Sequence, residues 1–80
     1  MEESYSDMYR KNMVYCDLCG RRVRVNNKQF LHHGKYGVIV GKLIDEDDGL
    51  EFLIVQYDIP YYGDTIEDLG AWTFNDLEFL

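Results

Sequence analysis

The chain has 80 residues, 46% of them hydrophobic and 15% aromatic, and it carries a formal net charge of −7. This length suits one domain with a small core, and the aromatic content excludes a disordered chain. No apolar run approaches the roughly 18 residues of a membrane span, and the acidic start does not resemble a signal peptide. Only two cysteines are present, which fits a reducing compartment, so we predict a soluble, cytoplasmic protein.

Charge is strongly segregated along the chain. All eight Lys and Arg residues lie within residues 10–42, where Asp17 is the only acid, so this segment carries +7. Residues 43–80 contain eleven acids and no Lys or Arg, and they carry −11. We expect this segregation to produce two opposed charged surfaces.

The first third of the chain changes from a polar lead-in to a β pattern. Residues 1–12 have apolar side chains at helical spacing, which is compatible with either a short helix or frayed coil. Residues 13–16 are typical of a strand that enters a tight turn at residues 17–18. Valine and arginine alternate over residues 22–25, which predicts a strand followed by a turn at the two asparagines and a return strand over residues 28–31.

The clearest β pattern spans residues 36–57. Residues 36–44 and 50–57 are rich in β-favouring side chains, and the acidic stretch 45–49 between them predicts a hairpin loop. Gly37 and Gly41 interrupt the first of these strands, and glycine inside a strand often marks a bulge or a bend.

The last third of the chain predicts one more strand pair. We expect a loop over residues 59–64, a helical or 3₁₀ turn over residues 65–70, a strand over residues 71–74 and a turn at residues 75–76. Leu77 and Phe79 then share one face and close the chain. The side chains expected in the core are Val38, Val40, Ile54, Trp72 and Phe74.

The segment from Gly34 to Gly41, the acidic turn and the strand from Leu53 to Asp58 together resemble the opening hairpin of SH3-like small barrels, the KOW and Tudor-type groups in particular. The Trp72–Phe74 segment with Leu77 is similar to the strand that closes those barrels. The resemblance covers roughly residues 34–80, and it implies binding to nucleic acid, a peptide or a protein without catalysis. We therefore predict a mostly β fold, a small SH3-like barrel with an N-terminal hairpin or knuckle extension over residues 13–33 and a lead-in over residues 1–12.

The extension contains a C-x₂-C-G motif, Cys16 to Gly20, which resembles a zinc knuckle. Structural zinc prefers four ligands, and His32 follows Cys19 at a spacing seen in Cys/His fingers. The adjacent His33 would point to the opposite face of a strand, so the fourth ligand would be an acid such as Asp17, water or another chain. The alternative is a pair of reduced thiols with no metal, and a redox motif is disfavoured because no βαβ pattern surrounds it.

Each charged half has an interpretation as a binding surface and another as a solvated face. In the basic half, Arg21, Arg22, Arg24 and Lys28 are candidate phosphate contacts for nucleic acid, or they pair with the acidic half. In the acidic half, acids and tyrosines alternate in a way that suits docking on a basic protein, or they only solubilise the chain. The candidate protein-interface residues are Asp47, Asp48, Tyr61, Tyr62 and Asp64.

Catalysis has little support in the sequence, because both serines lie in the lead-in, the paired acids lie in turns, and no phosphate loop or H-E-x-x-H motif is present. We therefore expect a non-enzymatic adaptor or inhibitor whose acidic half docks on a basic protein, such as a nucleic-acid enzyme. Viral host-takeover factors and toxin-immunity proteins provide an analogy of size and charge. The alternative is a nucleic-acid or ribonucleoprotein module that uses residues 21–28.

Overall fold

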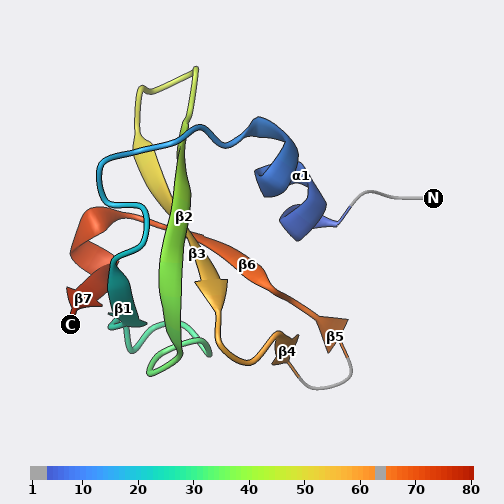
Figure 1. Cartoon of the computed structure of the whole chain (residues 1–80), viewed down its shortest axis with the longest axis vertical. Coiled ribbons are helices and arrows are strands. Elements are labelled where there is room, and N and C mark those ends of the chain that lie inside the picture. The colour runs from blue at the N-terminus through green and yellow to red at the C-terminus, as the bar shows by residue number, and fades with distance from the viewer. Residues whose placement is uncertain (1–3, 63–64) are drawn as a thin grey trace.

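The structure is a computed structural model that describes residues 4–62 and 65–80 (Figure 1). About 40% of the structure is strand and 15% is helix, which confirms the predicted mostly β class. The elements are α1 (Tyr5–Asn12), β1 (Arg22–Val25), β2 (Tyr36–Ile44), β3 (Glu51–Tyr57), β4 (Tyr61–Tyr62), β5 (Thr65–Ile66), β6 (Leu69–Trp72), the 3₁₀ helix η1 (Phe74–Asp76) and β7 (Leu77–Phe79).

Five strands form one antiparallel sheet in the order β6-β3-β2-β1-β7, and β4 pairs with β5 in a separate two-stranded ribbon. This arrangement is compatible with a small SH3-like barrel. The predicted hairpin from residues 22–25 to a return strand over residues 28–31 is wrong, because β1 pairs with β2 and β7 instead. Residues 28–31 lie in turns of the β1–β2 connection, where the Phe30 N–H donates a local hydrogen bond to the Asn27 carbonyl oxygen at 3.1 Å.

The long β2–β3 hairpin is confirmed, and so is the role expected of one glycine. The register between β2 and β3 shifts between Ile39 and Gly41, as a β-bulge does. A Cβ at Gly41 would lie 2.9 Å from Met13 Sδ and 3.0 Å from the Val14 carbonyl oxygen, so glycine lets the N-terminal segment cross the strand there. Residues 13–16 do not form the expected strand. They pair with the sheet through an isolated β-bridge between Val14 and Lys42.

The lead-in forms a helix, and tertiary contacts hold it in place. Ser4 Oγ accepts the Asp7 N–H at 3.1 Å as an N-cap, and Arg10 and Lys11 occupy the last turn, where cations are favoured. Ser6 is buried, and its hydroxyl lies 3.3 Å from Leu69 N and 3.5 Å from Leu69 O on β6. Helix α1 therefore lies beside β6, as Figure 1 shows.

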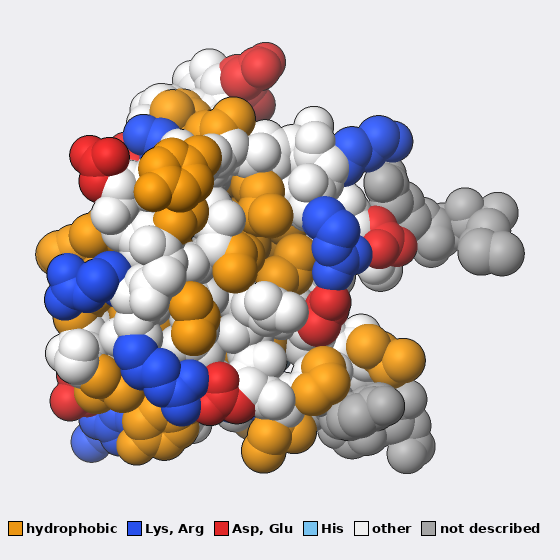
Figure 2. Space-filling view, in the orientation of Figure 1, with side chains coloured by type: hydrophobic (Ala, Val, Ile, Leu, Met, Phe, Trp, Pro, Cys, Tyr) orange, Lys and Arg blue, Asp and Glu red, His pale blue; other side chains and the backbone are white. Residues whose placement is uncertain are grey.

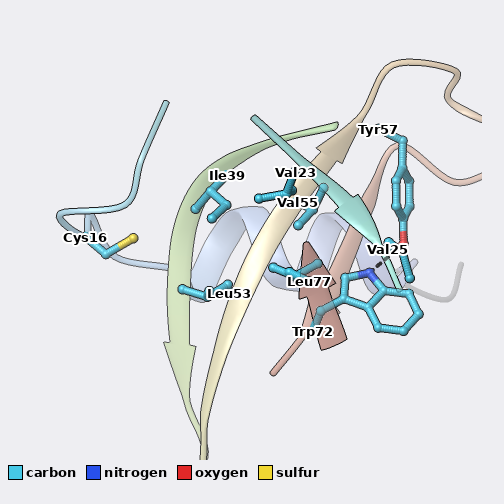
Figure 3. Packing of buried hydrophobic residues seen from close by; sticks show 9 residues of the cluster. All are labelled: Cys16, Val23, Val25, Ile39, Leu53, Val55, Tyr57, Trp72 and Leu77. Atoms are coloured by element: carbon cyan, nitrogen blue, oxygen red, sulfur yellow. Dashed lines mark hydrogen bonds between the residues drawn. The ribbon is translucent and has the colours of Figure 1, made fainter. Parts of the chain in front are cut away.

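The core cluster occupies one face of the sheet, and α1 packs along β6 at the edge of the sheet. The core cluster consists of Cys16, Val23, Val25, Ile39, Leu53, Val55, Tyr57, Trp72 and Leu77 (Figure 3). Ile54 and Leu69 are buried on the opposite face, so three consecutive residues of β3, from Leu53 to Val55, are buried. A strand that is covered on both faces loses the simple alternation of apolar and polar residues.

The core prediction is confirmed for Ile54 and Trp72 and needs correction at the other three positions. Ile39 is the large apolar side chain of β2 that is buried, whereas Val38 and Val40 on either side of it are half-buried. Phe74 is 59% exposed, because the chain leaves the sheet after Trp72 and turns through η1.

The segment between β3 and β6 also differs from expectation. The predicted helical turn over residues 65–70 is wrong, because β5 and the start of β6 occupy it. The loop expected over residues 59–64 includes β4, while Gly63 and Asp64 lie outside the described residues. The turn at residues 75–76 is part of η1, and β7 closes the chain through Leu77 and Phe79 as predicted.

We expect Trp72→Ala to lower the free energy of unfolding by about 3–5 kcal/mol, since it removes a ring that is 6% exposed. Phe74→Ala is the matched control, and because that ring is largely exposed it should cost less than about 1 kcal/mol. Urea unfolding of both variants measures the difference. Equal losses would contradict the placement of the two rings.

Candidate functional site

The tip of the β2–β3 hairpin gathers four acids, Asp45, Glu46, Asp47 and Asp48, which we call the acidic tip. Two of them build the turn: Asp45 Oδ1 accepts the Asp47 N–H, and Asp48 Oδ1 accepts the Leu50 N–H, both at 2.9 Å. Gly49 has a φ of 72°, a conformation that glycine adopts without strain. Short polar side chains and one glycine thus make a tight loop that carries four carboxylates at one end of the molecule (Figure 1).

No Lys or Arg of residues 4–62 or 65–80 forms an ion pair with the acidic tip. On the strands next to the turn, Lys42 Nζ lies 3.7 Å from Glu51 Oε1, so the charge of Glu51 is compensated. Ile44 and Leu50 flank the turn and are 52% and 47% exposed. The tip therefore combines uncompensated negative charge with two solvent-facing apolar side chains.

Two of the four predicted phosphate contacts, Arg22 and Arg24, are engaged with acids from the other half of the chain. Arg22 on β1 donates from Nη1 to Asp58 Oδ1 at 2.6 Å and from Nη2 to Asp58 Oδ2 at 2.5 Å. Arg24 Nε donates to Glu78 Oε2 at 2.9 Å, across the pairing of β1 with β7. The hydrogen bonds from Arg22 hold the pKa of Asp58 below its ordinary value.

Two members of the basic set make no such bond to a described acid. The Arg21 guanidinium lies over the Phe79 ring at 5.4 Å from its centroid, and Lys28 is exposed in the β1–β2 connection. The valines of β1 therefore point into the core, and its two arginines point to the outer face of the sheet. There the β3–β4 connection supplies the carboxylate of Asp58, and β7 supplies that of Glu78. Ion pairs from β1 to Asp58, which follows β3, and to Glu78 on β7 thus compensate part of the charge that is segregated in the sequence.

The two cysteines lie together in the turn of residues 17–20. Cys16 Sγ is 3.5 Å from Cys19 Sγ, and the Cys16 N–H donates to Cys19 Sγ at 3.4 Å. Cys16 is 8% exposed and belongs to the core cluster, whereas Cys19 is half-buried. Burial raises the pKa of the Cys16 thiol, and the hydrogen bond with Cys19 raises it further. Bringing two sulfur atoms this close suits one edge of a tetrahedral metal site.

His32 does not lie beside the two cysteines. Its ring stacks on Tyr57, with centroids 5.8 Å apart, and its Nε2 lies 2.9 Å from Glu67 Oε1. Figure 3 shows Tyr57 and Trp72 at the opposite end of the core cluster from Cys16. Within the described ranges, no group of three or more His, Cys, Asp or Glu residues could hold a metal ion. Zinc at Cys16 and Cys19 therefore stays a prediction that needs ligands other than His32.

The candidate protein-interface residues fall at two ends of the molecule. Asp47 and Asp48 are exposed in the acidic tip, whereas Tyr61 and Tyr62 form β4. The β2–β3 register places the tip beside the Ile44–Glu51 pair, and β4 follows the far end of β3 at Tyr57. Asp64 lies outside the described residues. The structure thus separates the tip from the tyrosine segment that the sequence grouped with it.

Comparisons with models of protein families, with curated proteins and with solved structures found no match. Among the described residues, no helix is long and apolar enough to cross a membrane.

The Arg22–Asp58 pair predicts a specific response to acid. The pKa of Asp58 is lower in the folded protein than in the unfolded chain, so the pair contributes stability above the unfolded value, roughly 3.9. That contribution is lost as the pH falls through the folded value. As the pH is lowered from about 5 to about 2, we expect the melting temperature of Asp58→Asn to fall less than that of the wild type. Parallel curves in a pH series of thermal melts would argue against the pair.

The zinc prediction is checked by elemental analysis of the purified protein. Bound zinc should reach up to one ion per chain or per dimer, and a chelator should lower the melting temperature because metal binding stabilises the folded state. Cys19→Ser should abolish both effects while leaving the core intact, since Cys19 lies outside the fully buried set. A metal-free wild type that melts identically with and without chelator would leave two reduced thiols.

Proposed function

We propose that this chain is a small SH3-like, non-enzymatic binding domain, an adaptor or inhibitor whose acidic tip docks on a basic protein. The observation that carries the proposal is the distribution of ion pairs. Arg10, Arg22, Arg24 and Lys42 pair with acids elsewhere in the fold. The four acids of the tip form no ion pair with a Lys or Arg of the described residues.

The geometry of the tip favours recognition by charge and apolar contact together. Exposed carboxylates raise the rate of encounter with a basic partner, and apolar side chains at the centre of an interface slow its dissociation. Ile44 and Leu50 lie at the two ends of the turn, so a partner that contacts the carboxylates also reaches them. A short loop that is held by its own aspartates needs little ordering on binding, which favours affinity.

Nucleic-acid binding through residues 21–28 receives less support. A phosphate would have to displace Asp58 from Arg22 and Glu78 from Arg24, so only Arg21 and Lys28 would contact it without breaking an ion pair. The net charge of −7 also opposes approach of a polyanion.

A pair of isosteric variants tests the tip. Asp47→Asn with Asp48→Asn removes two charges and retains the Asp48 Oδ1 acceptor of the turn. The control, Gln29→Lys with Gln56→Lys, makes the same change in net charge at two exposed positions away from the tip. Each protein is used to capture partners from host lysate, and association and dissociation rates are then measured with the purified captured protein.

We expect the tip variant to associate roughly three- to tenfold more slowly than the wild type at low salt, with little change in dissociation. The difference should disappear at high salt, because rim charges are screened. Ile44→Ser should instead speed dissociation. A partner that binds the tip variant and the control equally well, or an oligonucleotide that binds the wild type and is lost in Arg21→Gln, would overturn the proposal.

A further inference from the structure

A cavity of about 270 Å³ lies along the outer edge of β6, between helix α1 and the connection from β1 to β2. Aromatic rings make most of its wall. Tyr5 and Tyr9 contribute from the helix, Phe30 from the connection, and Tyr57 and Trp72 from the sheet. Its volume is below the roughly 300–1,000 Å³ of pockets for drug-sized ligands, so it suits one side chain better than a whole small molecule.

The rings of this cavity are held in a defined arrangement. Trp72 Nε1 donates to Tyr57 Oη at 2.9 Å, and the two side chains lie together in Figure 3. Phe30 meets Trp72 edge to face, with centroids 5.2 Å apart and planes at 89°. The His32 ring is stacked on Tyr57 at 12°. The cavity is therefore built before any ligand arrives, and electron-rich ring faces of this kind attract cations.

The charged side chains of the wall are two carboxylates, one of which, Glu67, is contacted by the imidazole of His32 at 2.9 Å. Glu67 and Asp76 line the cavity, and no Lys or Arg does. Asp76 is held by neutral donors, since Oδ1 accepts from Asn27 Nδ2 at 2.9 Å and Oδ2 from Thr73 Oγ1 at 2.8 Å. Its carboxylate is thus fixed in position with no Lys or Arg partner among the described residues, in contrast to the arginine-paired acids on the outer face of the sheet.

One residue of β6 offers its backbone to the same cavity. The bond from Tyr57 N to Asp68 O marks a hydrogen-bonded pair, so by alternation Gly70 and Trp72 bond to β3 while Leu69 and Ala71 face outward. The Ser6 hydroxyl forms hydrogen bonds with both outward groups of Leu69, since it accepts from the N–H and donates to the C=O. The outward N–H and C=O of Ala71 have no hydrogen-bond partner in the described part of the chain, and Ala71 lines the cavity.

We propose that this cavity binds the arginine or lysine side chain of an extended basic peptide segment, whose backbone pairs with Ala71 at the open edge of β6. Rings and carboxylates supply the contacts for the cation, and the strand edge supplies one pair of hydrogen bonds. The site shares its class of partner with the acidic tip and contains none of the tip residues, so the two proposals can fail separately.

The probe is a capped heptapeptide with arginine at its centre and alternating threonine and valine around it. The control peptide replaces arginine with citrulline, which keeps the shape and removes the charge. Trp72 is the only tryptophan, so its fluorescence reports directly on the cavity. Amide chemical shifts and hydrogen exchange of Ala71 report on the strand edge.

We expect the arginine peptide to change Trp72 fluorescence with a Kd at least about tenfold lower than that of the citrulline peptide. Binding should shift and protect the Ala71 amide. Phe30→Leu and Glu67→Gln, at residues that are exposed or half-buried, should each weaken binding several-fold. Phe74→Leu, an exposed ring outside the cavity, should not, and neither should Asp47→Asn with Asp48→Asn.

Equal affinity of the two peptides would overturn the proposal, as would arginine binding that Phe30→Leu and Glu67→Gln leave unchanged. No fluorescence change at millimolar peptide would also overturn it. Spectra of each variant without peptide confirm that it is folded, so that a loss of binding is assigned to the cavity. If tip-dependent capture persists while the peptide fails to bind, only the cavity proposal is refuted.

Discussion

The buried hydrogen bond from Trp72 Nε1 to Tyr57 Oη organises one end of the molecule. It joins β3 and β6 on the core face, where Gly70 leaves room for both rings, because a Cβ there would lie against Tyr57 Oη and 2.8 Å from Trp72 Nε1. Burial raises the pKa of Tyr57 to about 12, so its oxygen acts as a neutral acceptor at any pH the fold experiences. His32 and Phe30 pack on this pair and draw the long β1–β2 connection onto the sheet edge.

Helix α1 adds buried surface, which is scarce in a small domain. A chain of this length buries only roughly 60–65% of its unfolded surface, and a single-faced sheet would bury less. By packing along β6, where Ser6 contacts Leu69, the helix adds buried surface on the side of the sheet opposite the core cluster. Ser6 forms hydrogen bonds with the backbone of Leu69 at the edge of β6. The next outward-facing backbone groups on that edge, those of Ala71, have no such partner in the described part of the chain.

The charged residues of the described chain divide into those held in ion pairs and those without a Lys or Arg partner. The strand arginines are held by Asp58 and Glu78, whereas the acids of the tip and of the cavity wall have no Lys or Arg partner among the described residues. These acids are local, since four lie at the hairpin turn and Glu67 and Asp76 lie in the cavity wall with Trp72, where His32 contacts Glu67. In the proposed interaction, a basic partner would contact these acids while the Arg22–Asp58 and Arg24–Glu78 pairs stay intact.

The sequence by itself determined the β class, the long hairpin with its bulge near Gly41, the acidic turn and the burial of Trp72, because strand propensity, turn chemistry and ring size act over short distances. Only the tertiary structure decided the partners of β1, the separation of His32 from Cys16, and which face of β2 is buried. Pairing between strands far apart in the chain, and the helix on the second face, depend on long-range contacts that leave no local pattern. The pairing of Arg22 with Asp58 and the grouping of Phe30, Tyr57 and Trp72 around one cavity arise in the same way, since residues distant in sequence meet only when the sheet folds.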